Sequence, residues 1–102
     1  MKYNGNWVND KQQGLGKESW SNGLQYNGYY DNGKKNGKGR YKFPDGSTYK
    51  GDFVDNKIEG KGKYTWADGT KYIGEWKDNK MDGKGKQIWK DGRVYTGEFN
   101  NN

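Results

Sequence analysis

Cysteine and histidine are both absent from this sequence of 102 residues, and proline occurs only once. Without cysteine the chain has no disulfide framework and no thiolate, which fits a reducing compartment such as the cytosol. Without histidine the most common catalytic base is missing as well. No apolar run approaches the roughly 20 residues of a membrane-spanning helix, and the first residues do not resemble a signal peptide. These absences argue against Cys- or His-based catalysis and against a helical membrane span.

Aliphatic side chains are scarce, because hydrophobic residues make up 27% of the chain and aromatic residues alone make up 17%. Disordered chains are poor in aromatic rings, so this composition argues against disorder. Rings pack well on a pleated sheet and bury a large area per residue. The aliphatic residues are too few to fill a thick globular core. We therefore expect a thin β-structure that is one sheet deep.

A period of 23 residues is the strongest feature of the sequence, and it is carried by Tyr3, Tyr26, Tyr49, Tyr72 and Tyr95. Each tyrosine is followed two residues later by glycine and four residues later by an aromatic ring. Each full unit continues with a Gly-x-Gly pair, a second aromatic residue and an Asn-Gly or Asp-Gly pair. No insertion or deletion interrupts the units, so the chain is a tandem repeat.

The units resemble the MORN repeat, whose pattern is approximately YxGxWxxGKxHGxGxxxxxDG. Two of them read YNGYYDNGKKNGKGRYKFPDG and YKGDFVDNKIEGKGKYTWADG. The resemblance predicts a single domain over residues 1–102, with repeats at 3–25, 26–48, 49–71 and 72–94 and a partial unit at 95–102. The histidine of the family pattern is replaced by Gln13, Asn36, Glu59 and Asp82. Glycine precedes the repeat lysine only at Gly33, and the other units have Asp10, Asn56 and Asn79.

Apolar and polar residues alternate within each unit, which predicts β-strands. Tyr49 and Phe53 should face one side of a sheet, while Lys50 and Asp52 face the other. Each repeat is predicted to be a β-hairpin, and Pro44-Asp45-Gly46 is predicted to form a type I turn followed by a left-handed residue. The expected fold class is all-β: an elongated, twisted antiparallel meander of hairpin repeats in a single sheet. About nine strands would span roughly 40 Å.

The repeated glycines are predicted to serve packing, because they share a face with the rings. A ring on one strand can lie over a glycine of the next strand, which has no side chain to obstruct it. Gly37-Lys38-Gly39 contains a Gly-x-Gly motif, but no helix is predicted to follow it, so a nucleotide-binding loop is not expected.

Residues with catalytic or metal-binding chemistry are few. Ser19, Ser21 and Ser47 have no evident base. Acidic residues recur before the turn glycines, where aspartate commonly caps its own backbone. No Asp-rich calcium loop is present. We expect no enzymatic activity, no metal and no cofactor.

The aromatic face is the first candidate binding site. One predicted line of rings comprises Trp7, Tyr30, Phe53 and Trp76, and a second comprises Tyr41, Tyr64, Trp66 and Trp89. Most of these rings should be core, and the remainder should form a groove for a helix or an extended peptide. Glu18 and Gln87 replace the ring in the end repeats, as polar caps or as the limits of a groove two repeats long. Tyr29 is off the pattern and is predicted to face outward.

A basic stripe on the opposite face is the second candidate, and the net charge of +6 permits acidic partners in general. The stripe comprises Lys38, Arg40, Lys61, Lys63, Lys84 and Lys86. A row of cations can bind anionic phospholipid. The alternative is that the cations pair across strands with Asp52, Glu75 and Glu98. Nucleic acid is not expected, because the rings that would stack on bases lie on the other face.

The sheet edges, at residues 3–8 and 95–100, are the last candidates, since an unpaired edge invites pairing with another chain. A homodimer or a place in a large complex would complete them. The resemblance implies a cytoplasmic assembly scaffold of the cytoskeleton, for example in cilia or axonemes. A peripheral membrane adaptor, or a targeting module of a larger enzyme, remains the alternative.

Overall fold

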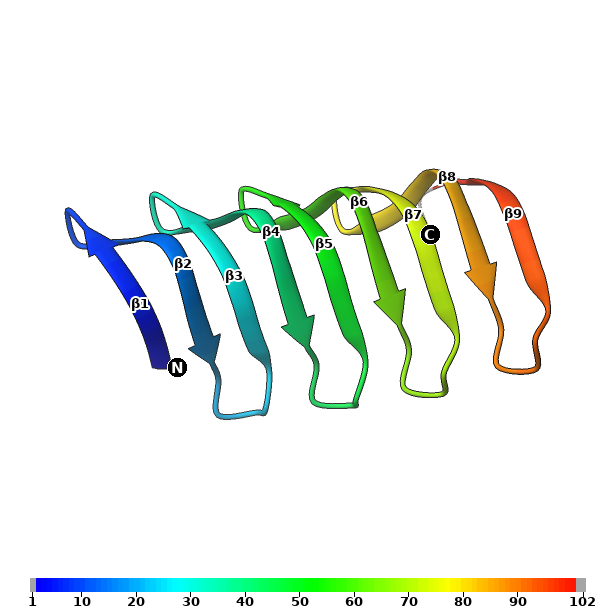
Figure 1. Ribbon diagram of the computed structural model, residues 1–102, viewed down its shortest axis with the longest axis horizontal. Coiled ribbons are helices and arrows are strands. Elements are labelled where there is room, and N and C mark those ends of the chain that lie inside the picture. Colours follow the sequence, from blue (N-terminus) through cyan, green and yellow to red (C-terminus); the bar gives the residue numbers. More distant parts are fainter. Residues whose placement is uncertain (1, 101–102) are drawn as a thin grey trace.

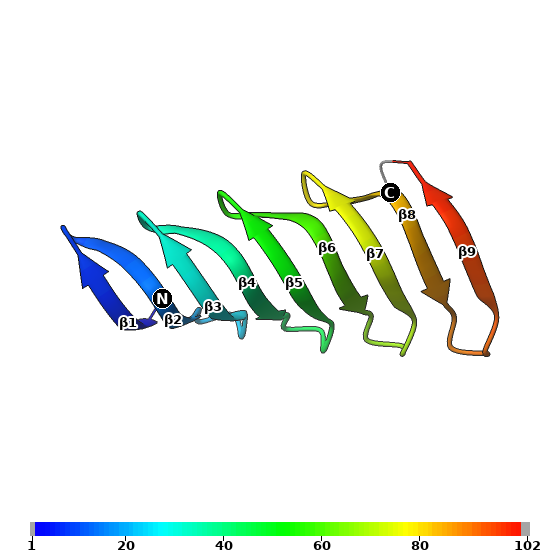
Figure 2. The ribbon, with the colours of Figure 1, turned by 45° about the horizontal axis from the view of Figure 1, so that its top comes forward.

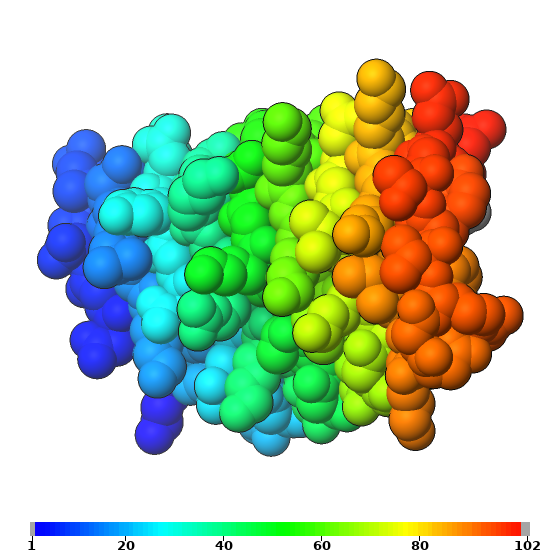
Figure 3. All heavy atoms as spheres, turned by 45° about the vertical axis from the view of Figure 1, so that its right-hand side comes forward, coloured from blue at the N-terminus to red at the C-terminus, as the bar shows by residue number. Residues whose placement is uncertain are grey.

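The computed structural model describes residues 2–100 and shows one open antiparallel sheet of nine strands in chain order (Figure 1). The strands are β1 (Lys2–Val8), β2 (Lys11–Ser19), β3 (Gln25–Asp31), β4 (Lys34–Lys42), β5 (Thr48–Val54), β6 (Lys57–Thr65), β7 (Lys71–Lys77), β8 (Lys80–Ile88) and β9 (Val94–Phe99). The molecule measures 47 × 25 × 17 Å. The predicted all-β meander is confirmed, and Figure 3 shows its hairpins as successive bands from one end to the other.

Two kinds of turn alternate along the chain and lie on opposite long edges of the sheet (Figures 1 and 2). The turn between β1 and β2 has two left-handed residues, Asn9 at φ 51° and Asp10 at φ 63°, as a two-residue type I′ hairpin requires. The turn between β4 and β5 has three residues, 44–46, because the Phe43 N–H donates to the Ser47 carbonyl at 2.9 Å and closes the hairpin there. There the Gly46 N–H donates to the Phe43 carbonyl at 3.1 Å, and Gly46 is left-handed at φ 94°. This is the turn that the sequence predicts.

A row of glycines crosses the sheet from β1 to β9, and we call it the glycine seam. It contains Gly5, Gly16, Gly28, Gly39, Gly51, Gly62, Gly74, Gly85 and Gly97, paired strand by strand. A methyl group at Gly39 would lie 2.5 Å from the Tyr26 hydroxyl oxygen. The tyrosine ring therefore occupies the space that a side chain would need, as predicted.

The core consists of rings on one face of the sheet. Tyr26, Tyr49 and Tyr72 are fully buried, and each hydroxyl donates to a main-chain carbonyl three residues later. Phe53 packs edge-to-face against the rings of Tyr26 and Tyr49, with centroids 5.2 and 5.3 Å apart. Beside the seam the register shifts, for example between Gly51 and Phe53. Such bulges bend strands, so the sheet curves around its rings.

Candidate functional site

The first predicted line of rings lies mostly in the core. Tyr30, Phe53 and Trp76 are buried, and the indole N–H of Trp76 donates to the Gly62 carbonyl at 3.1 Å. Trp7 differs because it is 56% exposed on the edge strand β1. The three buried rings contribute to stability and do not offer a contact surface.

The second predicted line lies at the surface of the core. Tyr41, Tyr64, Trp66 and Trp89 are all half-buried. Phe43, which the sequence did not single out, connects them: its ring centroid is 5.3 Å from that of Tyr41 and 5.7 Å from that of Tyr64. Tyr64 in turn lies 4.7 Å from Trp66. We call Tyr41, Phe43, Tyr64 and Trp66 the ring strip. Trp89 stands apart from it, with the Arg93 guanidinium 5.4 Å from its ring centroid.

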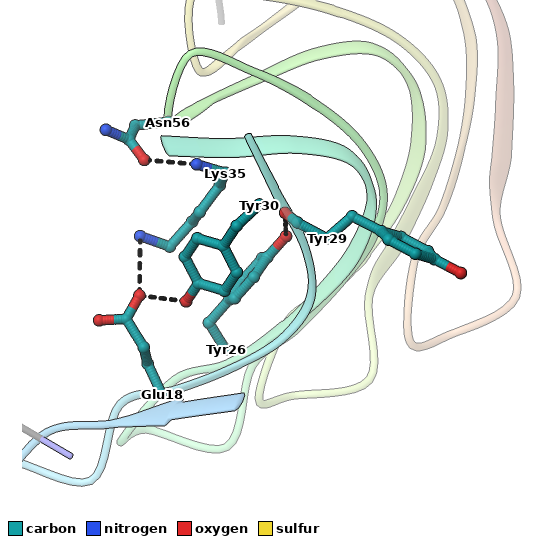
Figure 4. A network of polar contacts seen from close by, with 6 residues as sticks. All are labelled: Glu18, Tyr26, Tyr29, Tyr30, Lys35 and Asn56. Carbon is teal, nitrogen blue, oxygen red and sulfur yellow. Dashed lines mark hydrogen bonds and ion pairs between the residues drawn. The ribbon is translucent and has the colours of Figure 1, made fainter. Parts of the chain in front are cut away.

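Glu18 occupies a ring position at the N-terminal end of this face (Figure 4). Glu18 is only 4% exposed, and its side chain accepts a hydrogen bond from the Tyr30 hydroxyl. The Lys35 ammonium lies 3.9 Å from the Glu18 carboxylate and 5.3 Å from the centroids of Trp20 and Tyr26. Burial lowers the pKa of Lys35, and Glu18 opposes that effect. Burial and the hydrogen bond to Glu18 raise the pKa of Tyr30. The charged pair closes this end of the aromatic face.

The basic stripe separates into two rows on either side of the glycine seam. The first, which we call the mixed row, places Lys38, Lys61 and Lys84 opposite Asp52, Glu75 and Glu98. Lys38 Nζ lies 2.5 Å from Asp52 Oδ1. Burial disfavours the charged form of Asp52, but hydrogen bonds from Lys38 and from the Lys61 N–H outweigh it and lower the pKa of Asp52. Among the described residues of this row only Lys38 makes an ion pair, while Lys61 and Lys84 lie opposite Glu75 and Glu98 by strand register.

The second row, which we call the cation row, contains the other predicted cations together with two that the sequence analysis did not include. In strand order it holds Lys17, Asn27, Arg40, Lys50, Lys63, Ile73, Lys86 and Thr96. No acidic residue occupies this row. Arg40 and Lys50 are direct cross-strand partners, and so are Lys50 and Lys63.

An open groove of about 990 Å³ runs between the two rows, with glycines of the seam as its floor. Leu15, Tyr29 and Ile73 line it and are between 45% and 56% exposed. Figure 4 shows the Tyr29 ring pointing away from Tyr26 and Tyr30, so its predicted outward orientation is confirmed. Tyr29 stands where Asp52 and Glu75 stand in the next two hairpins. There each acid accepts the N–H of a lysine beside the seam, at 3.3 Å for Lys61 and 2.7 Å for Lys84.

The two-residue turns are joined to one another by contacts that the sequence analysis missed. The Asn79 N–H donates to the Ile58 carbonyl at 3.0 Å, and the Asn79 side chain accepts the Ile58 N–H at 2.8 Å. Asn56 makes the same two contacts with Lys35 (Figure 4). Gly33 has no side chain and keeps only the main-chain bond, to Gln12. The sequence signal for these contacts was asparagine at positions 56 and 79, where the family pattern has glycine. Asparagine tolerates the left-handed backbone of the turn and adds a side-chain acceptor.

The three-residue turns are capped by their own aspartates. Asp45, Asp68 and Asp91 each accept the N–H of the residue two positions later, at 2.8 to 3.1 Å. These hydrogen bonds lower the pKa of all three carboxyls. Within residues 2–100 no group of three or more side chains is arranged to hold a metal ion. The same residues contain no helix with the length and apolarity needed to cross a bilayer.

A single-layered sheet of stacked hairpins defines a repeat module of the solenoid type. The chain belongs to the MORN repeat family, whose profile matches residues 3–25, 26–48, 49–71 and 72–92. MORN repeats are non-catalytic scaffold modules that bind proteins or membranes, and they are associated with membrane and cytoskeletal proteins. No individual curated protein matches the chain at a significant level.

Proposed function

We propose that this chain is a non-enzymatic assembly scaffold that binds another protein on its aromatic face. The observation that supports this most is the ring strip, a contiguous set of half-buried Tyr, Phe and Trp side chains. Such rings are already largely ordered in the free protein, so little side-chain conformational entropy is lost on binding. Tyr, Phe and Trp are also enriched in protein interfaces. The strip offers apolar area to a partner without the need to open the core.

The partner on this strip is an amphipathic helix or an extended peptide. The strip is narrow, and it crosses the two central hairpins from Tyr41 on β4 to Trp66 after β6. A narrow apolar line suits a segment that presents one apolar face. The edge strands β1 and β9 offer a second route to assembly, by strand pairing with a partner or with a second copy.

The test is a comparison of two variants as bait in cell extract. Phe43→Ser/Trp66→Ser should lose the partner, because it removes the ring that connects Tyr41 with Tyr64 and the one indole of the strip. Val54→Ser is the control, since Val54 is exposed and lies at the other end of β5 from Tyr49, the cross-strand partner of Tyr41 and Tyr64. Circular dichroism checks the fold of each variant. Equal retention of the partner by all three proteins would refute binding on the strip.

We further propose a place in the cytoskeleton, in a ciliary or axonemal structure. An elongated repeat sheet with two open edges suits a structural component, and MORN repeats occur in cytoskeletal proteins. A tagged chain in its native cells should stay with the cytoskeletal pellet after detergent extraction. Release by detergent would instead favour the membrane adaptor. The acids that lie opposite Lys38, Lys61 and Lys84 in the mixed row weaken that alternative, because they reduce the net positive charge there.

A further inference from the structure

The cation row contains an unfavourable arrangement at its centre. Arg40, Lys50 and Lys63 lie on three consecutive strands, and each is the direct cross-strand partner of the next. Like charges directly opposite one another destabilise a sheet. Within residues 2–100 these three side chains make no ion pair. Lys38, on the other side of the seam from Arg40, has one with Asp52. The sheet therefore places acids where they neutralise one wall of the groove and leaves the other wall charged.

The groove beside these cations is partly apolar. Leu15 and Tyr29 are direct cross-strand partners at one end, and Ile73 lies toward the other. All three are exposed. From Tyr29 on β3 to Ile73 on β7 there are four strand spacings, or about 19 Å. The three central cations lie on the strands between them.

We propose that this groove binds an extended acidic segment of another protein, independently of the ring strip. An extended chain advances about 3.3 Å per residue, so two apolar side chains about six residues apart would reach the two apolar ends. Acidic side chains on the alternate residues between them would lie over Arg40, Lys50 and Lys63. The floor of the groove is main chain, because side chains at the seam would point to the ring face, so the backbone of the segment can come close to the sheet.

A bilayer and a nucleic acid fit this surface less well. A flat layer of lipid headgroups would contact the two rows of side chains more than the main-chain floor between them. Single-strand binders combine cations with several stacking rings in one groove, whereas Tyr29 is the one aromatic side chain that lines this groove among the described residues. A polypeptide supplies both the acidic and the apolar groups that the groove would match.

The test measures fluorescence anisotropy with the full chain and a fluorescein-labelled peptide that carries Leu-Ser-Glu-Ser-Glu-Ser-Leu at its centre. Lys50→Glu is the informative variant, because Lys50 is the middle cation. Lys77→Glu is the matched control: it makes the same change of charge at an exposed lysine that also faces a lysine, Lys80, away from the groove. A second peptide with Gln in place of Glu tests the need for acid.

We expect Lys50→Glu to weaken binding about tenfold or more, since attraction to the acidic peptide becomes repulsion. Lys77→Glu should change the affinity less than about twofold. The Gln peptide should bind the wild-type chain about as weakly as the Glu peptide binds the Lys50→Glu variant. Phe43→Ser/Trp66→Ser should bind the peptide normally, which separates this proposal from binding on the ring strip. Circular dichroism confirms that Lys50→Glu is folded.

Three results would overturn the proposal. The first is the absence of peptide binding that depends on glutamate. The second is an equal loss with Lys50→Glu and Lys77→Glu, which would indicate attraction by net charge alone. The third is binding of phosphatidylserine vesicles or of single-stranded oligothymidine that is sensitive to Lys50→Glu, when the peptide does not bind.

Discussion

The smallest structural unit of this protein is one tyrosine with two glycines. Tyr26 lies over the seam, its hydroxyl donates to the Tyr29 carbonyl at 2.9 Å, and its ring fills the space beside Gly28 and Gly39. The ring buries its apolar area against backbone, and its one polar atom is satisfied. Neither residue type can change without the other, which explains why tyrosine and glycine keep the same 23-residue interval throughout the chain.

Substitution within the seam should be costly where the tyrosine cannot move. In Gly39→Ala the new methyl group would lie 2.5 Å from the buried Tyr26 hydroxyl oxygen. We expect the free energy of unfolding in urea to fall by about 1–3 kcal/mol, the usual cost of overpacking. Gly97→Ala is the control, because the Tyr95 ring beside it is 43% exposed and can swing aside. Equal losses in the two variants would contradict this account of the seam.

Side-chain burial was only partly predictable from sequence at this scale. The ring-over-glycine packing and the aspartate-capped turns follow from residue types and spacing, and both were predicted. The burial of Tyr30, Phe53 and Trp76 depends on how far the strands bend, which no local pattern encodes. The division of the basic stripe depends on cross-strand register. The register of β4 against β5 places Asp52 opposite Lys38 and Lys50 opposite Arg40, and sequence spacing alone does not give that register.

At the scale of the element, the hairpins are held together at their turns as well as along their strands. Asn56 and Asn79 each connect a two-residue turn to the preceding hairpin through one main-chain and one side-chain hydrogen bond. The turn at Gly33 keeps a side-chain bond through Gln13, which accepts the Asn32 N–H at 3.0 Å. It lacks the bond that Asn56 and Asn79 make, although its backbone at φ 81° resembles that of Asn56 at φ 70°.

Gly33→Asn should complete that junction and stabilise the protein. A Cβ atom at this position would meet no heavy atom closer than 3.7 Å, and asparagine accepts a left-handed backbone. We expect the free energy of unfolding to rise by about 0.5–1 kcal/mol, which is the net value of one hydrogen bond. Asn79→Gly should lower it by a similar amount. Thermal and urea unfolding measure both changes, and a loss of stability in Gly33→Asn would disprove the junction account.

The three-residue turns should make stability depend on acid. Hydrogen bonds from main-chain N–H groups lower the pKa of Asp45, Asp68 and Asp91 from the ordinary value of 3.8. A carboxyl whose pKa is lower in the folded state stabilises the fold above its unfolded pKa, and this contribution is lost as the pH falls through the folded value. Unfolding midpoints should therefore decrease as the pH falls below about 4.

A triple variant, Asp45→Asn/Asp68→Asn/Asp91→Asn, isolates this effect. Asparagine keeps the acceptor but does not titrate, and Asn22 already makes the same contact in the first repeat, with the Leu24 N–H at 3.0 Å. The decrease in unfolding midpoint with acid should be shallower in this variant than in the wild type. An identical pH dependence in the two proteins would show that the turn aspartates do not contribute.

At the scale of the whole molecule, the core is a chain of phenol rings that passes from hairpin to hairpin. Tyr26, Tyr49 and Tyr72 belong to three successive repeats, and Phe53 and Trp76 bridge them with centroid distances of 5.2 to 5.5 Å. No repeat buries its own rings without its neighbours, so the array should unfold as a cooperative unit. The fold class was predictable from sequence because the tyrosines, glycines and second rings that make these contacts recur every 23 residues.

Alkaline solution should unfold this array. Burial raises the pKa of the three core tyrosines above the ordinary value of 10.0. The unfolded chain then loses its phenolic protons first, so stability is lost as the pH rises above about 10. Tyrosinate absorbance should show a late step that coincides with loss of the near-ultraviolet circular dichroism of the sheet. Ionisation of all tyrosines in a folded sheet would contradict the buried core.

The glycine seam also sets a unit of length. It continues through every hairpin in the same register, so an added repeat would contribute two strands, or about 9.6 Å, without a new kind of turn or a new core. Both walls of the groove would lengthen by the same step. Duplication of one unit in the gene would therefore produce a longer sheet with the same cross-section. The distance between partners bound at its two ends would increase in steps of one repeat.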